Sequence, residues 1–116
     1  MKKILVIDDE ERVRRVYVRT LVEEGMLVRE AQDASEALNI LIREDIDLVL
    51  LDIKMPQIDG KVVFEVIREY DPSLRIIISS IYPIDQQKHL IPYALDYFDK
   101  SKGVAYLLEK ITAVVR

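Results

Sequence analysis

The chain has 116 residues, of which 50% are hydrophobic and 33% are charged, and its formal net charge is −4. This length suits one domain, and the mildly acidic balance argues against a surface that neutralises nucleic-acid phosphates. Because there is no cysteine, disulfides and thiolate metal sites are excluded. The apolar runs are too short to cross a membrane and no signal-peptide pattern precedes the first, so we expect a cytoplasmic protein without membrane association.

Short apolar runs alternate with helical patterns along the whole chain. The runs predict buried parallel strands over residues 3–8, 27–31, 47–52, 75–80 and 95–99. The second of these runs carries Arg29 and Glu30, charged residues that are typical of a strand at a sheet edge. The third run is the most apolar and should be central.

Helical spacing of apolar residues predicts the connecting helices. The stripes are Val13, Val16, Tyr17, Thr20 and Leu21; Ala34, Ala37, Leu38, Leu41 and Ile42; Val63, Val66, Ile67 and Tyr70; and Val104, Leu107, Leu108, Ile111 and Val115. Asp33 is placed to cap the second helix. Between Pro83 and Pro92 the apolar pattern is broken, so we expect a short or irregular fourth helix there. The order is (βα)5, which predicts an α/β fold with helices on both faces of a parallel sheet.

Five polar residues fall where these apolar runs stop: Asp8, Asp9, Asp52, Ser80 and Lys100. If every run is a parallel strand, their side chains gather at the carboxyl edge of one sheet, where ligands bind in such folds. Three carboxylates held together need a counter-cation, and Lys100 supplies only one positive charge. Mg²⁺ suits a site of few carboxylates and several waters, and it can neutralise a transferring phosphoryl group. Asp52 is then the expected nucleophile, and Ser80 either donates to a phosphoryl oxygen or bonds to local backbone.

This pattern resembles the receiver domains of two-component response regulators. The resemblance rests on the stretches Ile4–Glu10, Asp52–Gly60 and Tyr97–Lys100, and on Ser80. It implies a flavodoxin-like doubly wound sandwich of strand order 2-1-3-4-5, formed by a single receiver domain over residues 1–116. It also implies Mg²⁺-dependent transfer of a phosphoryl group to Asp52 from a sensor histidine kinase or phosphotransfer protein.

The same resemblance assigns roles to further residues. Asp9 and Asp52 would bind Mg²⁺ directly, Asp8 would act through water, and Lys54 would offer its backbone carbonyl. Ser80, Lys100 and Tyr97 would sense the phosphoryl group and switch a surface formed by the fourth helix, fifth strand and fifth helix. That surface would bind a downstream protein or effector domain, or a second copy of the chain. Such a domain assists its own phosphorylation and dephosphorylation and is not a conventional turnover enzyme.

The sequence departs from the family pattern near this surface. Ile81 stands where Ala or Gly is usual, Ser101 where Pro is usual, and Tyr93 where Gly is expected. Ile81 is β-branched and stiff, so we expect it, with Lys54 and Tyr82, to narrow the access to Asp52. Phosphorylation by small donors, and loss of the phosphoryl group, should therefore be slow.

Two other functions remain open on sequence grounds. A small phosphatase with an Asp nucleophile would carry a second acid two residues after Asp52, where this chain has Lys54. A degenerate receiver would bind partners without phosphorylation, although the intact acids argue against that reading. The lone His89 is expected at the surface. The basic residues of the first helix are expected on a solvated face, or otherwise in a kinase-docking surface; they are Arg12, Arg14, Arg15 and Arg19.

Overall fold

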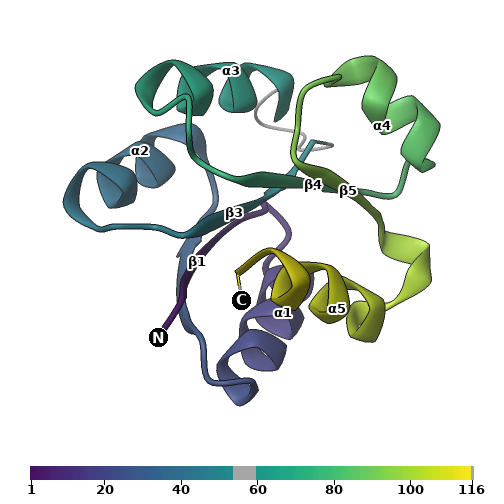
Figure 1. Cartoon of the computed structure of the whole chain (residues 1–116), viewed down its shortest axis with the longest axis horizontal. Helices are drawn as coiled ribbons and strands as arrows, with labels where there is room; N and C mark the ends of the chain where they lie inside the picture. Colours follow the sequence, from purple (N-terminus) through teal and green to yellow (C-terminus); the bar gives the residue numbers. More distant parts are fainter. Residues whose placement is uncertain (54–59, 116) are drawn as a thin grey trace.

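A computed structural model describes residues 1–53 and 60–115, and within these ranges the chain forms one parallel sheet flanked by helices (Figure 1). The strands are β1 (Lys3–Ile7), β2 (Leu27–Ala31), β3 (Leu48–Asp52), β4 (Ile76–Ser80) and β5 (Asp96–Asp99). The helices are α1 (Glu11–Glu23), α2 (Ala34–Arg43), α3 (Gly60–Tyr70), α4 (Ile84–Leu90) and α5 (Val104–Val115), with a 3-10 turn η1 (Lys100–Lys102) before the last. The predicted order of alternating strands and helices is confirmed.

The sheet has the strand order β2-β1-β3-β4-β5, as expected for a flavodoxin-like fold. All neighbouring strands run parallel, and their register is continuous: Ile7 lies opposite Leu51, and Asp52 lies opposite Ser79. Because the strands are in register, the residues that follow β1, β3, β4 and β5 reach the same edge of the sheet. The register therefore places the polar strand ends together.

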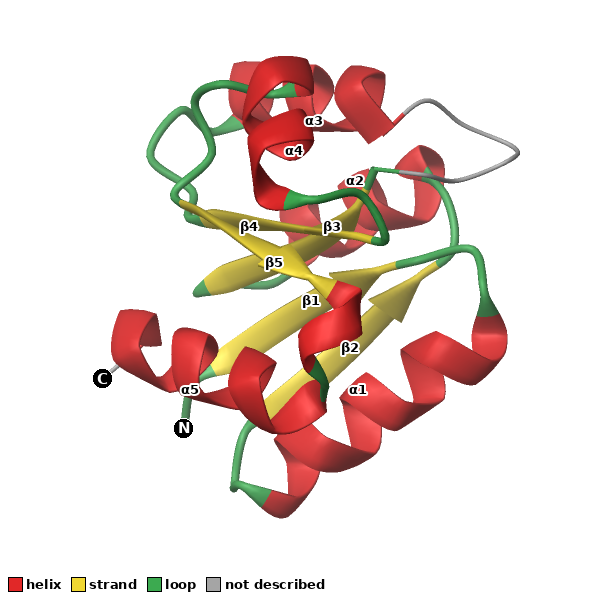
Figure 2. Ribbon diagram, turned by 90° about the vertical axis from the view of Figure 1, so that its right-hand side faces the viewer, coloured by secondary structure: helices red, strands yellow, loops and turns green. Residues whose placement is uncertain are grey.

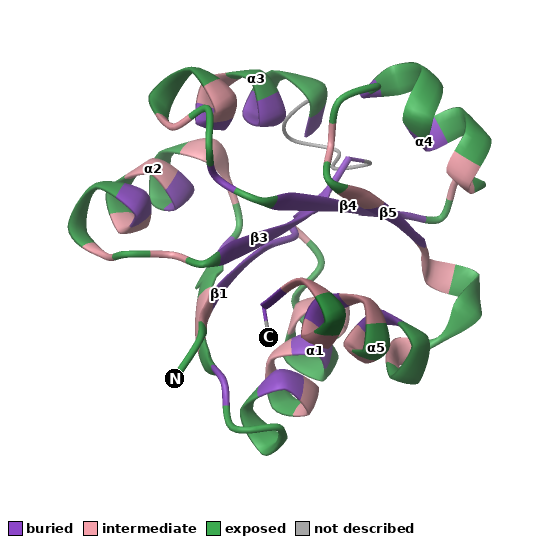
Figure 3. Ribbon diagram, viewed as in Figure 1, coloured by how far each residue is buried: buried purple, intermediate pink, exposed green. Residues whose placement is uncertain are grey.

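Alternating strand residues feed two separate apolar cores. On one face α1 and α5 cover the sheet, and on the other α2, α3 and α4 cover it (Figures 1 and 2). Ile4 and Val6 pack in the core beneath α1 and α5, whereas Leu5 and Ile7 pack in the core beneath the other three helices. Burial on both faces explains why β1, β3 and β4 are apolar except at their ends (Figure 3).

The edge strand β2 differs from the central strands as the sequence predicted. Arg29 and Glu30 on this strand form ion pairs, Arg29 with Glu44 and Glu30 with Arg14, both with an N–O distance of 2.9 Å. Paired charges on an edge strand discourage pairing with another chain. The exposed side of the sheet edge is thus occupied by charge.

Helix ends follow local chemistry. The carboxylate of Asp33 accepts a hydrogen bond from the Glu36 N–H at 2.9 Å, which confirms the predicted cap of α2. The Glu36 side chain, in turn, accepts from the Gln32 N–H at 3.1 Å. At the start of α3, a Cβ added to Gly60 would lie 2.2 Å from the Cα of Ile53, so this helix approaches the end of β3 more closely than any side chain allows.

The predicted short fourth helix is confirmed, because α4 has only 7 residues. Two predictions for α1 were wrong. Val16 was expected in the buried stripe, but it is 50% exposed. Arg14 was expected on a solvated face, but its side chain is only 13% exposed and it turns toward the sheet. The helix is rotated so that Tyr17 and Leu21 provide its buried contacts.

Across residues 1–53 and 60–115, none of the helices is both long and apolar enough to cross a membrane.

Candidate functional site

Three aspartates meet at the carboxyl edge of the sheet. Asp8 and Asp9 follow β1, Asp52 ends β3, and one carboxylate oxygen from each lies within 4.8 Å of those of the other two. They meet because β1 and β3 are paired neighbours. Asp8 is 1% exposed and Asp52 is 5% exposed, whereas Asp9 lies nearer the surface. Buried carboxylates this close together repel one another unless a cation is near.

Lys100 brings one positive charge to these acids. Its Nζ lies 3.0 Å from Oδ2 of Asp52 and 3.2 Å from Oδ2 of Asp8. Lys100 begins the turn after β5, which is separated from β3 by β4, so its long side chain spans the intervening strand end. Burial by itself lowers the pKa of the Lys100 ammonium, but Asp52 and Asp8 outweigh burial and raise that pKa above its ordinary value. Lys100 therefore stays charged.

Asp9 shows that one cation does not satisfy the cluster. Its burial, followed by the neighbouring Asp8 carboxylate, raises the pKa of Asp9 above its ordinary value, although Lys100 acts in the opposite direction. A third negative charge is thus disfavoured here in the absence of further positive charge. The donors are all carboxylate oxygens, which a hard divalent cation such as Mg²⁺ prefers, so the residues present fit that ion.

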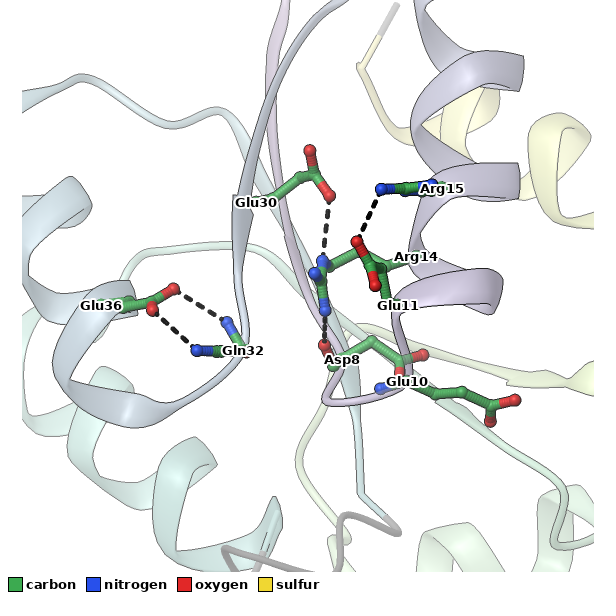
Figure 4. A network of polar contacts seen from close by, with 8 residues as sticks. All are labelled: Asp8, Glu10, Glu11, Arg14, Arg15, Glu30, Gln32 and Glu36. Atoms are coloured by element: carbon green, nitrogen blue, oxygen red, sulfur yellow. Dashed lines mark hydrogen bonds and ion pairs between the residues drawn. The ribbon is translucent and has the colours of Figure 1, made fainter.

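Hydrogen bonds fix the backbone around Asp8. The Arg14 guanidinium donates to the backbone carbonyl of Asp8 at 2.7 Å and to Glu30 at 2.9 Å (Figure 4). The other side of the turn is held by the Glu10 N–H, which donates to Oδ1 of Asp8 at 2.9 Å. Arg14 thus ties α1 and β2 to the acidic turn, a structural role that the sequence analysis did not predict.

The predicted sensing residues are buried behind the acids. Ser80 is fully buried, and its Oγ accepts a hydrogen bond from the Tyr82 N–H at 3.1 Å. Tyr97 is 5% exposed; its hydroxyl donates to the backbone carbonyl of Ile91 and accepts from the Ala94 N–H at 3.2 Å. Tyr97 is therefore turned inward, toward the end of α4.

The predicted access residues lie differently from one another. Ile81 is 60% exposed, and Tyr82 is half-buried. Lys54, expected to offer a carbonyl to the metal and to narrow the opening, lies outside the described residues, as do Met55 to Asp59. The basic residues Arg12, Arg15 and Arg19 are exposed, as expected, and so is His89.

Two hydroxyl residues close to the acids were missed by sequence reasoning. Ser79 lies opposite Asp52 in the register and is 1% exposed, and its Oγ has no hydrogen bond of good geometry within the described residues. Burial raises the pKa of the Tyr17 phenol, while the nearby Ser79 hydroxyl and Lys100 ammonium oppose the rise. Period-2 alternation could have found Ser79, since it faces the same core as Ile77. Tyr17 was hidden in the apolar stripe of α1.

Comparisons with known proteins agree with this geometry. The family model for the response regulator receiver domain matches residues 4–112. Over 98% of this chain, it is 33% identical to the response regulator MprA of Mycolicibacterium vanbaalenii, of which it covers 50%. The curated relatives it matches are longer, and the chain spans half of their length or less.

Two crystal structures of one protein from Thermotoga maritima are close in fold. The response regulator TrrA in complex with Mg²⁺-BeF is 35% identical, with a TM-score of 0.87, covering 98% of this chain and 99% of that one. TrrA in complex with the histidine kinase ThkA is 34% identical, with a TM-score of 0.88 and full coverage of both chains, at 100% each.

The strand order, the acidic edge of the sheet and the matched family model together identify the class of domain as a receiver domain. This chain belongs to the response regulator receiver domain family.

Proposed function

We propose that Asp52 is the phosphoacceptor of a single receiver domain formed by residues 1–116. The observation that carries this proposal is the position of its carboxylate, at the end of the central strand, within 4.8 Å of Asp8 and Asp9 and 3.0 Å from the Lys100 ammonium. The donor is a phosphohistidine on a sensor histidine kinase or a phosphotransfer protein. TrrA, which is similar over the whole chain, has been crystallised with such a kinase.

The transfer needs little covalent chemistry from the protein. A carboxylate oxygen of Asp52 attacks phosphorus, the bond from phosphorus to the histidine nitrogen breaks, and its electron pair stays on that nitrogen. An acyl phosphate forms, and positioning and charge neutralisation supply most of the catalysis. Mg²⁺ would be held by Asp9 and Asp52 directly and by Asp8 through water, with the Lys54 carbonyl as a further ligand, and it would offset repulsion between the carboxylates and the phosphoryl group.

The protein's own cation and hydroxyl complete the site. The Lys100 ammonium contacts Asp52, and its side chain would shift so that the ammonium contacts a phosphoryl oxygen. Ser80 would donate its hydroxyl hydrogen to another. Tyr97 would respond to this movement, because its hydroxyl is bonded at the end of α4. The surface of α4, β5 and α5 would then change its affinity for a downstream protein, an effector domain or a second copy of the chain.

The setting of this proposal is a cytoplasmic signalling pathway without direct contact to nucleic acid or membrane by this domain. The formal net charge of −4 is unfavourable for binding to nucleic-acid phosphates. The chain spans half or less of the length of its curated relatives. The response to phosphorylation would therefore come from a downstream partner or from an effector domain attached to the receiver domain.

Asp52→Asn tests the assignment directly. Wild type incubated with Mg²⁺ and acetyl phosphate should gain the mass of one phosphoryl group, labile to hydroxylamine and mapped to Asp52. Asp52→Asn should abolish this labelling while the circular dichroism spectrum stays native. Asp45→Asn, on an exposed acid just before β3, is the matched control and should label like wild type.

Three results would contradict the proposal. Undiminished labelling of Asp52→Asn would place the phosphoryl group elsewhere. A folded wild type that binds Mg²⁺ but takes no phosphoryl group from acetyl phosphate or from a phosphorylated kinase would identify a degenerate receiver, and steady release of phosphate from small esters would identify a phosphatase.

A further inference from the structure

A buried glutamine is the inward-facing residue of α4. Gln87 is fully buried, and it is the buried residue among the seven described for this helix. Its neighbours Gln86 and Lys88 are exposed. A short helix that covers a sheet edge usually turns an aliphatic side chain inward, so a primary amide at this position requires an explanation from its contacts.

The Gln87 amide joins two segments of backbone. Its Nε2 donates to the backbone carbonyl of Tyr82 at 2.7 Å and to the backbone carbonyl of Phe98 at 2.9 Å. Tyr82 lies between β4 and α4, whereas Phe98 lies in β5, at the edge of the sheet. The two hydrogens of one side chain are therefore given to two different elements.

The other end of the same amide is unsatisfied. Oε1 of Gln87 is buried and has no hydrogen-bond partner within residues 1–53 and 60–115. A buried carbonyl without a partner is destabilising, and an aliphatic side chain of similar shape would avoid this loss. The two donated hydrogen bonds, and not the packing, are thus what the glutamine contributes.

The contacts of Gln87 lead to both residues that would hold a phosphoryl group. Both backbone groups of Tyr82 are bonded, because its N–H donates to Ser80 Oγ at 3.1 Å while its carbonyl accepts from Gln87. Phe98 is separated from Lys100 by Asp99 alone. Gln87 therefore links the segment after Ser80 to the segment before Lys100, at the ends of β4 and β5, the two strands that follow β3 in the sheet order.

This link also settles the direction of the Ser80 hydroxyl. A hydroxyl has one hydrogen to donate and two lone pairs with which to accept. Accepting from the Tyr82 N–H occupies a lone pair and leaves the hydrogen of Ser80 to be donated. Holding the Tyr82 N–H in place thus keeps the hydroxyl hydrogen of Ser80 turned away from that N–H and available to donate.

We propose that Gln87 is a positioning residue that fixes the Ser80 hydroxyl and the Lys100 ammonium relative to each other, through its hydrogen bonds to the carbonyls of Tyr82 and Phe98. The proposal rests on Asp52 being the phosphoacceptor. It adds to that function a residue that lies behind the site and that touches neither the metal ligands nor the phosphoryl group.

Gln87→Met tests this role, because methionine keeps the length of the side chain and removes both donors. Gln86→Met, one residue earlier on the exposed side of α4, is the matched control. We expect Gln87→Met to slow the labelling of Asp52 by acetyl phosphate at saturating Mg²⁺ roughly tenfold, which corresponds to the loss of about one net hydrogen bond in the transition state. Gln86→Met should leave the rate constant unchanged.

A double-mutant cycle with Ser80→Ala separates positioning from a general loss of stability. Because Gln87 acts partly through Ser80 and partly through Lys100, the loss in the double variant should be smaller than the product of the two single losses. The Mg²⁺ concentration at half-maximal rate should stay the same, since Gln87 is no ligand. Multiplied losses in the double variant, or a labelling rate of Gln87→Met equal to that of Gln86→Met, would overturn the proposal.

Failure of the underlying function would look different, because the wild type itself would then carry no label on Asp52. If Gln87→Met does not fold, side-chain hydrogen exchange in the wild type decides the question. The Gln87 amide hydrogens should exchange far more slowly than those of Gln86. Equal exchange of the two amides would overturn the proposed link.

Discussion

At the scale of single residues, replacing Asp9 should weaken Mg²⁺ binding without lowering the stability of the metal-free protein. Burial and Asp8 raise the pKa of Asp9, so its charged form is disfavoured without metal. Asp9→Asn removes this charge, and without metal we expect the variant to be at least as stable as wild type. Wild type should become more stable as Mg²⁺ is added, by linkage, and the variant should lose this gain and most of its phosphorylation.

Urea unfolding in a series of Mg²⁺ concentrations measures both effects. Glu10→Gln, the next residue along, keeps the turn and removes an acid outside the cluster of three carboxylates, so it should retain the Mg²⁺-dependent gain. Equal responses of Asp9→Asn and Glu10→Gln to Mg²⁺ would remove Asp9 from the set of ligands.

Replacing Ile81 tests whether the opening to Asp52 limits the rates of phosphorylation and of phosphoryl loss. Its side chain is 60% exposed directly after Ser80, so Ile81→Ala should change stability by less than about 0.5 kcal/mol. With the obstruction gone, both phosphorylation by acetyl phosphate and loss of the phosphoryl group should become faster. The two rate constants can be measured beside Leu90→Ala, an exposed apolar change on α4. Unchanged rates would mean that Ile81 does not face the opening.

The sequence identified some residues of the site and missed others for a physical reason. Asp8, Asp52 and Lys100 could be found because each interrupts or follows an apolar strand, and the parallel sheet brings such ends together. The burial of Gln87 could not be predicted, because the sequence of a short amphipathic helix does not distinguish a buried glutamine from an exposed one. The turned-in Arg14 depends on the rotation of α1, which the apolar stripe leaves undetermined.

At the scale of secondary-structure elements, the start of α3 lies close against Ile53, the residue that follows β3. Alanine in a helix is normally better than glycine by about 0.5–1 kcal/mol. At Gly60 the added Cβ would lie 2.2 Å from the Ile53 Cα, which is backbone and cannot swing away. We expect the clash to outweigh the propensity, so that Gly60→Ala lowers the free energy of unfolding by about 2 kcal/mol or more.

Urea unfolding of Gly60→Ala, with Val62→Ala as the control, checks this sign. Val62 lies on the same helix and is 53% exposed, so its replacement should be close to neutral. A stabilised Gly60→Ala would show that α3 can move away from β3 at no loss.

The turn between α3 and β4 provides a pH-dependent contribution to stability. Hydrogen bonds from the Ser73 hydroxyl and N–H to the Asp71 carboxylate, at 2.7 and 3.0 Å, lower the pKa of Asp71 below its ordinary value of 3.8. The folded state therefore favours the charged form. Its contribution is fully present above the ordinary pKa and is lost as the pH falls through the lowered pKa of the folded state.

Asp71→Ala should accordingly be less stable than wild type at neutral pH. The difference should be constant down to about pH 5 and should shrink as the pH approaches 3. Chemical unfolding at each pH measures it, and Asp45→Ala, at an exposed acid in another loop, should show no such convergence. A difference that is independent of pH would indicate that Asp71 acts through packing and not through its charge.

The ends of a helix were predictable where a single residue determines them through local chemistry. Asp33 caps α2, and Pro83 and Pro92 limit α4, because a short acceptor side chain and a missing N–H act locally. The exposure of Val16 was not predictable in this way. It depends on the angle at which α1 packs against the sheet, which is decided by contacts with β2 and α5 and not by the helix alone.

At the scale of the whole molecule, several exposed apolar residues lie around α4, β5 and α5. Around α4 and β5 they are Ile81, Leu90, Tyr93 and Leu95, and Tyr106 lies on α5. This is the surface that the sequence analysis assigned to a downstream partner or a second copy, and that assignment stays a prediction. The α/β class with helices on both faces was predictable from the alternation of strands and helices, whereas the strand order was predicted from the resemblance to receiver domains.

β1 is an interior strand with a neighbour on each side, and this has a consequence for folding during synthesis on the ribosome. β1 pairs with β2 on one side and with β3 on the other, and Ile4 lies opposite Leu48. A nascent chain that has emerged only as far as Asp47 holds β1, β2 and two helices, but lacks the strand that covers the second side of β1. That side of β1 is a row of unpaired backbone N–H and C=O groups, so the growing polypeptide exposes an open strand edge until β3 leaves the exit tunnel, and completion of the sheet competes with aggregation.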